Sequence, residues 1–155
     1  MTVISSSDSR SRHKLLLPIL VGGFAAGLLD LIAAFITMGW GIPRGIAGGL
    51  IGAQARHGGV AIWVLGVLIH FFIAFSAAAI YCASSIKLDF LRDHPLVCGL
   101  FYGIAIFLFM NLVVLPLSAL HATGPYEYSE LIQGLIISMF IIGIPISVSL
   151  WKLSN

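Results

Sequence analysis

The chain has 155 residues, of which 59% are hydrophobic and only 9% are charged. A soluble domain carries about 25% charged residues, so this composition excludes a soluble globular protein and predicts an integral membrane protein. The net charge of +2 is too small to predict binding of nucleic acid. The length leaves room for one membrane domain and no second domain.

The first fourteen residues are polar and rich in serine, which predicts a disordered cytoplasmic tail over residues 1–14. Basic residues in this tail precede an apolar run, as they do in a signal peptide. That run is longer than a typical signal-peptide core and is interrupted by Asp30, so we predict a helix that is retained.

Four apolar runs follow, and each is close to the ~20 residues that a membrane-spanning helix needs. Because lipid cannot hydrogen-bond the edges of an open sheet, we predict an all-α fold. Residues 15–155 should form a single domain, a bundle of four transmembrane helices. The predicted spans are Leu15–Gly39, Val60–Ser84, Leu96–Leu120 and Leu131–Trp151.

The segment Gly41–Gly59 connects the first two spans and reads GIPRGIAGGLIGAQARHGG. Pro43 suits the first turn of a helix, and the glycine pair at the end of the segment suits its termination. Such a helix is amphipathic and too short to span, so we predict an interfacial or re-entrant helix. Its glycines lower helix stability, which packing on the bundle or closure over a pocket would offset. Candidate contacts in this outer segment are Arg44, Arg56 and His57.

The distribution of lysine and arginine predicts the orientation, because cytoplasmic segments carry an excess of both. Arg44 and Arg56 lie on one side of the predicted spans. Six basic residues lie on the other side, namely Arg10, Arg12, Lys14, Lys87, Arg92 and Lys152. Both termini are therefore predicted to be cytoplasmic.

Small residues recur at helical spacing within the spans, as Gly23 and Gly27 do in the first and Gly99 and Gly103 in the third. In a membrane, small residues let helix backbones approach closely, and polar groups then form hydrogen bonds across the contact. The spans are therefore predicted to pack through these stripes.

Each span also carries one polar residue at a similar depth, roughly 10–15 Å below its outer end at 1.5 Å per residue. These residues are Asp30, His70, Asn111 and Ser138. A carboxylate in the hydrocarbon region costs about 3 kcal/mol or more, so Asp30 should face the bundle interior. An acid, an imidazole and an amide can share protons and hydrogen bonds. This layer predicts either a ligand or proton site, or a static clasp that fixes helix register.

No metal site and no cofactor are predicted. The chain contains no nucleophile elbow, P-loop, dinucleotide-binding glycine motif or HExxH sequence. Haem would need axial histidine or methionine ligands, and His70 is the only histidine inside a span. His57, His121, Glu127 and Glu130 lie on the outer side, where we interpret them as a solvated loop rather than a site for a divalent cation.

Several strings carry a resemblance to known proteins, among them GLLDLIAAF, RGIAGGLIGAQARHGG, LGVLIHFFIAFSAAAIY and HPLVCGLFYGIAIFLFMNLVVLPLSA. Over roughly Gly22–Ala122 the chain resembles a group of uncharacterised four-span bacterial inner-membrane proteins, some of them grouped with YagU-like proteins. The resemblance implies a small multi-pass protein of the bacterial inner (cytoplasmic) membrane. That group has no assigned catalytic residues, so it implies none for this chain.

Three functional hypotheses follow. In the first, the polar centre binds or passes a small solute, a proton or a lipid. Four helices are few for a transporter, so this hypothesis calls for a homo-oligomer. In the second, the protein is a structural or accessory subunit of a larger membrane complex. In the third, which the sequence favours least, Asp30 and His70 form the acid–base pair of a membrane-embedded enzyme.

Overall fold

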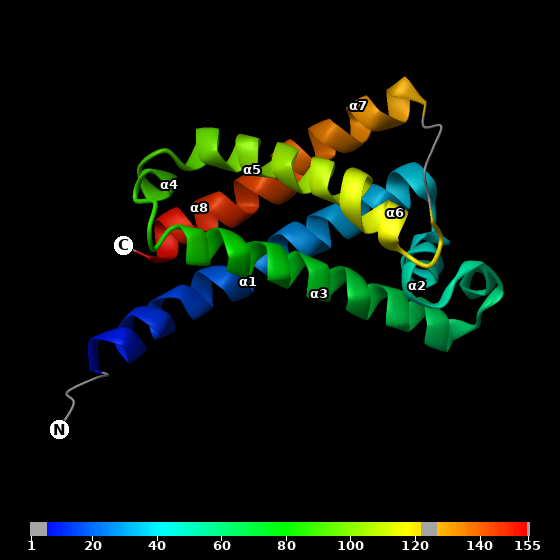
Figure 1. The fold of residues 1–155 in the computed structure, drawn as a ribbon, viewed down its shortest axis with the longest axis horizontal. Coiled ribbons are helices and arrows are strands. Elements are labelled where there is room, and N and C mark those ends of the chain that lie inside the picture. Colours follow the sequence, from blue (N-terminus) through cyan, green and yellow to red (C-terminus); the bar gives the residue numbers. More distant parts are fainter. Residues whose placement is uncertain (1–5, 122–126, 155) are drawn as a thin grey trace.

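The computed structural model describes residues 6–121 and 127–154 of the chain, and their side chains from residue 15 onward. Within these residues every regular element is helical, and four helices are long and apolar enough to cross a membrane. The predicted all-α, four-span fold is therefore confirmed (Figure 1). The spans are Leu15–Met38, Val60–Ser84, Pro95–Leu117 and Tyr128–Leu153.

The helical elements do not match the four spans one to one. The first span is part of a longer helix, and the third and fourth spans each contain three elements. The first lies in α1 (Ser6–Met38) and the second is α3 (Val60–Ser84). The third consists of α5 (Pro95–Phe109), the π-helix η2 (Met110–Val114) and α6 (Leu115–Leu117). The fourth consists of α7 (Tyr128–Ile137), the π-helix η3 (Ser138–Gly143) and α8 (Ile144–Leu153). A short helix, α4 (Phe90–Asp93), connects the second span to the third.

The first helix begins at Ser6, within the segment that the sequence predicts to be a disordered tail. A helix that is already formed over the apolar span extends at the cost of fixing one further residue per added hydrogen bond, which is far cheaper than nucleating a new helix. Residues 6–14 are therefore helical in the structure. Residues 1–5 of the predicted tail lie outside the described residues.

The predicted short helix between the first two spans is present as α2 (Ile42–Ile51), with Pro43 in its first turn. It ends at Gly52 rather than at the glycine pair 58–59. Gly52 has φ 87°, a left-handed conformation that stops an α-helix and that glycine adopts without steric cost. A 3₁₀ helix, η1 (Ala53–His57), then leads to α3.

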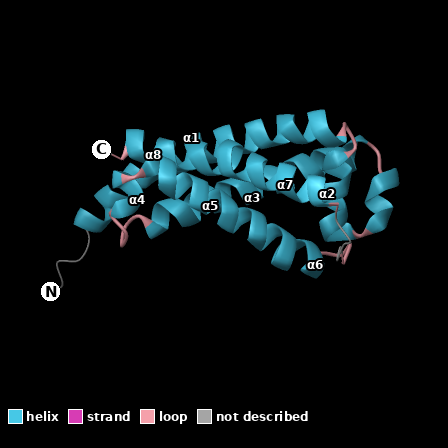
Figure 2. Cartoon of the chain, turned by 90° about the horizontal axis from the view of Figure 1, so that it is seen from above, coloured by secondary structure: helices cyan, strands magenta, loops and turns pink. Residues whose placement is uncertain are grey.

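The spans pack in a chain of neighbours rather than as a closed square. α1 packs between α3 and the fourth span, and the fourth span packs between α1 and α5. Both ends of the described chain and α4 lie at one end of the bundle, while α2 and α6 lie at the other (Figures 1 and 2). Among the described residues, α3 and α5 have no packing interface of comparable extent.

Glycines make these helix contacts possible. A side chain at Gly66 of α3 would overlap the carbonyl oxygen of Pro43, in the first turn of α2. A Cβ atom at Gly103 of α5 would lie 2.5 Å from the Cα of Met139 on the fourth span. Gly99 and Gly143 face each other across the same crossing. The predicted small-residue stripes therefore lie where helix backbones come closest.

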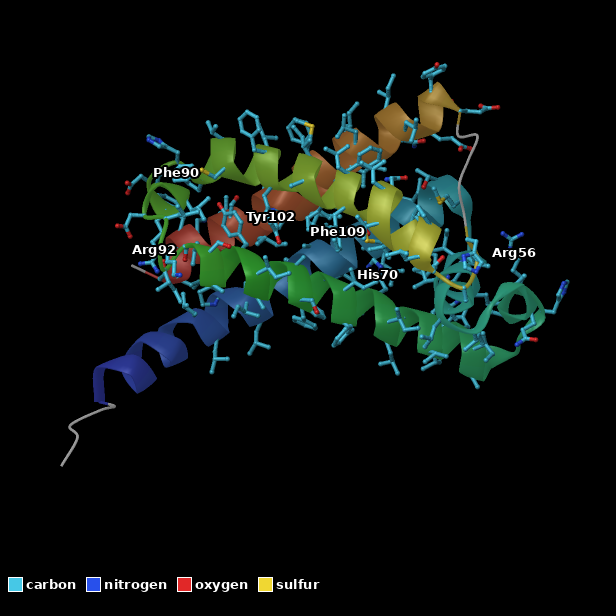
Figure 3. The ribbon with its side chains drawn as sticks, in the orientation of Figure 1. Arg56, His70, Phe90, Arg92, Tyr102 and Phe109 are labelled. Atoms are coloured by element: carbon cyan, nitrogen blue, oxygen red, sulfur yellow. The ribbon has the colours of Figure 1, made fainter. Side chains whose placement is uncertain are left out.

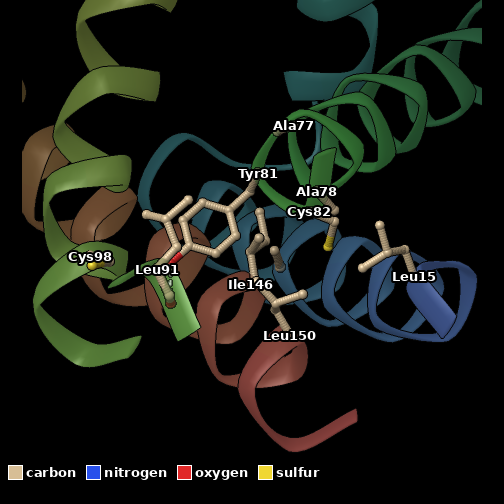
Figure 4. Close-up of a cluster of buried hydrophobic side chains, with 10 residues drawn as sticks. Leu15, Ala77, Ala78, Tyr81, Cys82, Leu91, Cys98, Ile146 and Leu150 are labelled. Atoms are coloured by element: carbon tan, nitrogen blue, oxygen red, sulfur yellow. Dashed lines mark hydrogen bonds between the residues drawn. The ribbon is translucent and has the colours of Figure 1, made fainter. Parts of the chain in front are cut away.

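The most completely buried apolar side chains gather near the α4 end of the bundle. Tyr81, Ile146 and Leu150 are buried there together with Cys82 (Figure 4). The hydroxyl of Tyr81 donates to the carbonyl oxygen of Leu91 at 3.4 Å, so this core also holds the α4 connection. The bundle is thus tightly packed at the end near α4 and less tightly packed toward the end near α2.

We expect Gly103→Ala to lower the free energy of unfolding by about 1–3 kcal/mol, because the added methyl group meets backbone that cannot easily move. Gly45→Ala is the matched control, since no atom lies within 4 Å of a Cβ at that position. The control should leave stability unchanged or raise it by up to about 1 kcal/mol. Unfolding in detergent, followed by circular dichroism, measures both. Equal stability of the two variants would contradict the close crossing.

Candidate functional site

The four polar residues predicted to share one layer all line a single cavity of about 440 Å³. They come from four different spans: Asp30 from α1, His70 from α3, Asn111 from η2 and Ser138 from η3. Small and aliphatic side chains make up most of the remaining wall. The cavity is therefore a largely apolar space with a few polar groups, which is the usual composition of a small-molecule site.

Asp30 and His70 are the polar pair that comes closest in this cavity. The His70 Nε2 atom lies 2.8 Å from the carbonyl oxygen of Gly27 and 3.9 Å from the Asp30 Oδ2 atom. Because a carbonyl oxygen only accepts, the first distance places a proton on Nε2, which donates to Gly27. The carboxylate of Asp30 lies just beyond hydrogen-bond length from the imidazole.

The position of His70 follows from the sequence of the facing helix. Gly27 is one turn before Asp30, and a Cβ atom there would lie 3.0 Å from the Cβ of Ala74 on α3. The absence of a side chain at Gly27 lets α3 approach closely enough for the imidazole to reach a backbone carbonyl. The side chains of His70 and Asp30 remain 12% and 27% exposed, respectively, so a bound molecule can contact both.

Asn111 and Ser138 lie on the same wall but are held by their own helices. The Asn111 side-chain amide donates to the carbonyl oxygen of Phe107 at 2.9 Å, and Ser138 is buried at the start of η3. Among the described side chains, neither has a hydrogen bond to Asp30 or His70. The four residues therefore share a cavity without forming the continuous network that the sequence suggested.

Both of these residues lie in π-helical segments, which the sequence analysis did not predict. Pro116 follows η2 closely and Pro145 follows η3, and neither proline has an amide hydrogen to donate to the preceding turn. Loss of that hydrogen bond allows the helix to widen. The two prolines were the available signal for these irregular segments.

Glu130 also lines the cavity, whereas the sequence analysis assigned it to a solvated outer loop. It lies in the first turn of α7, and Glu130, Gly134 and Ser138 recur at four-residue spacing. Residues at this spacing share one helix face, so the stripe runs along the cavity from an exposed carboxylate to the buried serine. This spacing is the signal that could have identified Glu130.

The cavity is bounded at one end by α2. Ile42 and Ile46 of this helix line the wall. The carbonyl of Pro43 packs against Gly66, and the Gly49 carbonyl accepts a hydrogen bond of 2.8 Å from the Ala119 amide. The amphipathic helix thus turns apolar side chains toward the cavity.

The basic candidates of the outer segment do not line the cavity. Arg44 lies on α2 and is partly buried, and its Nε atom is shielded from solvent. Arg56 and His57 are exposed on η1, at the end of the bundle opposite Arg92 (Figure 3). Among the described side chains, the titratable group that pairs with Asp30 is therefore His70 rather than an arginine.

Two tyrosines, Tyr81 and Tyr102, lie outside the cavity wall and join α3 to α5. The Tyr102 hydroxyl on α5 donates to the carbonyl of Ala77 on α3 at 2.7 Å, and Ala77 lines the cavity (Figure 3). The rings of Tyr102 and Tyr81 are tilted at 57° to each other, with centroids 4.8 Å apart. These contacts join α3 to α5 on the α4 side of the cavity.

No protein-family profile, curated protein or solved structure matches the chain. The fold and the site together define a class: a small protein with four membrane-capable helices and, between them, a partly open and mainly apolar cavity that is lined by a polar group from every span. Such a cavity can hold a small molecule with an apolar body and one polar or charged group.

We expect His70→Phe to lower stability by about 0.6–1.7 kcal/mol, because it removes the hydrogen bond to the Gly27 carbonyl while keeping an aromatic ring. Ser76→Ala is the control, since the Ser76 hydroxyl bonds only to the Phe72 carbonyl of its own helix. Thermal unfolding of both variants in detergent measures the difference. A His70→Phe protein as stable as the control would show that the link between α1 and α3 contributes nothing.

Proposed function

We propose that the protein binds a small solute or lipid-like molecule in the cavity between its spans. The observation that carries this proposal is that the polar residue of each span lines one cavity of about 440 Å³. A static clasp would place those groups against one another. Only Asp30 and His70 approach each other, whereas Asn111 donates to its own helix and Ser138 has no described hydrogen bond to the other three.

The dimensions of the cavity support a ligand rather than a few water molecules. Sites for drug-sized molecules occupy roughly 300–1,000 Å³ and are mainly apolar, with a few polar groups that fix orientation. The volume and wall of this cavity agree with both properties. Passage of the ligand across a membrane would further require the Tyr81–Tyr102 contact to open, or a second copy of the chain to complete a path.

The acid–base alternative is supported by the Asp30–His70 pair alone. The Nε2 proton of His70 is donated to the Gly27 carbonyl, and the carboxylate is 3.9 Å away. Proton transfer between the two groups would need the imidazole to leave that carbonyl or a ligand to bridge the gap. Binding requires neither change, so we place it first.

We further propose that the protein lies in a bacterial inner membrane with both termini in the cytoplasm. The sequence resemblance to bacterial inner-membrane proteins supports the first part. The excess of lysine and arginine in the two terminal segments and the α3–α5 connection supports the second. Those three segments also lie at the same end of the bundle.

We expect the purified protein to retain a small molecule that native mass spectrometry detects and that Asp30→Asn reduces. The amide is nearly isosteric with the carboxylate, so the fold and thermal stability should be kept while the charge is lost. Asp89→Asn is the matched control, because Asp89 is exposed near α4 and does not line the cavity. It should retain the molecule at the wild-type level.

A different result would show that the polar residues form only a static clasp that fixes helix register. If Asp30→Asn is silent in ligand retention and in any assay of activity, while Asp30→Leu lowers stability by roughly 1–2 kcal/mol, Asp30 serves only to join helices. That result would favour the accessory-subunit hypothesis over binding.

The proposed orientation predicts that reporter fusions after Asn155 and within the outer segment at Gly58 give opposite signals. The C-terminal fusion should score as cytoplasmic and the Gly58 fusion as external, because basic residues are retained on the cytoplasmic side. A truncated chain fused after Lys87 should behave as the C-terminal fusion does. An external C-terminus would refute the orientation.

A further inference from the structure

We propose that the ligand of this cavity is an organic cation with an apolar body. This inference rests on the proposed function and narrows it from any small solute or lipid to one charge class. It depends on which charged side chains line the cavity, where they lie along it, and what forms the rest of the wall.

The charged residues of the cavity wall have one sign. Asp30 and Glu130 are both carboxylic acids, and the described wall contains no lysine or arginine. His70 is the only other titratable group there, and its Nε2 proton is already donated to the Gly27 carbonyl. An anion in this space would meet two carboxylic acids with no lysine or arginine in the described wall to offset them, whereas a cation would be attracted by both.

The two carboxylates differ in exposure. A cationic ligand could therefore meet the exposed Glu130 first and then bind at the less exposed Asp30. Glu130 is exposed in the first turn of α7, two turns before the buried Ser138 on the same helix face. Asp30 is only 27% exposed and lies midway along its span. Charge interactions at the exposed site are screened by salt, while those at the enclosed site are screened far less. Asp30 is therefore the group expected to determine affinity.

The remainder of the wall suits the body of such a ligand. Phe107 lines the cavity, and an aromatic face attracts cations as well as apolar groups. Met38 and Met110 also line it, and methionine adapts its flexible side chain to ligands of different shape. Arg44 would oppose a cation, but it is not among the residues of α2 that line the cavity.

The test uses two probes of the same shape and opposite charge, tetraphenylphosphonium and tetraphenylborate. Their binding to the full-length protein in an uncharged detergent is measured by equilibrium dialysis, with empty micelles as the blank. Wild-type protein should bind the phosphonium ion above the blank and the borate ion no more than the blank. Asp30→Asn should weaken phosphonium binding about tenfold or more, as expected when one partner of a desolvated charge pair is neutralised. Asp89→Asn should bind as the wild type does.

A second arm identifies the source of the cation, since an ammonium group occurs both on free amines and on lipid headgroups. Lysophosphatidylethanolamine is added as a competitor. Displacement of the phosphonium ion would support a lipid amine, and lack of displacement would support a free organic cation.

Two results would overturn the inference, and they separate it from the proposed function. Equal binding of the two probes, or phosphonium binding that Asp30→Asn leaves unchanged, removes the charge preference. If the purified protein still retains a molecule that Asp30→Asn reduces, binding in the cavity stands and only its charge class is wrong. If no molecule is retained and neither probe binds, both proposals fail.

Discussion

Close backbone contact at glycines is the interaction on which the rest of this structure depends. Helices surrounded by lipid gain little from burying apolar side chains against one another, so they associate where backbones can approach. Gly27 provides this between α1 and α3, Gly22 between α1 and the fourth span, Gly66 between α2 and α3, and the Gly99–Gly103 pair between α5 and the fourth span. Each of these contacts joins one neighbouring pair of helices, and together they arrange the spans in a chain.

The cavity lies where that chain of contacts does not close. No glycine of the described residues brings α3 against α5, and the two helices are joined only near α4 by the Tyr81–Tyr102 contact. The space left between them is bounded by α1 and the fourth span, with α2 across one end. Asp30 therefore lies on the wall of this cavity and is only partly buried, with its side chain 27% exposed.

The same glycine contacts position the polar side chains. His70 reaches the Gly27 carbonyl because that glycine has no side chain to hold α3 away. Asn111 and Ser138 are oriented differently, by π-helical turns that precede Pro116 and Pro145. Two of the four polar residues thus owe their positions to packing between helices, and two owe them to irregularities within a helix.

The sequence by itself determined the number of spans, their limits to within a few residues and the presence of a short helix before α3. These features depend on long apolar runs and on glycines, whose effects on the backbone are local. It also identified Asp30, His70, Asn111 and Ser138 from their depth in the spans. Only the tertiary structure decided that these residues line a cavity, that just two of them approach each other, and that Glu130 belongs to the wall. The depth of a residue in its span follows from counting residues along one helix. The direction in which its side chain points, and its distance from residues of other spans, depend on how separate helices rotate and cross.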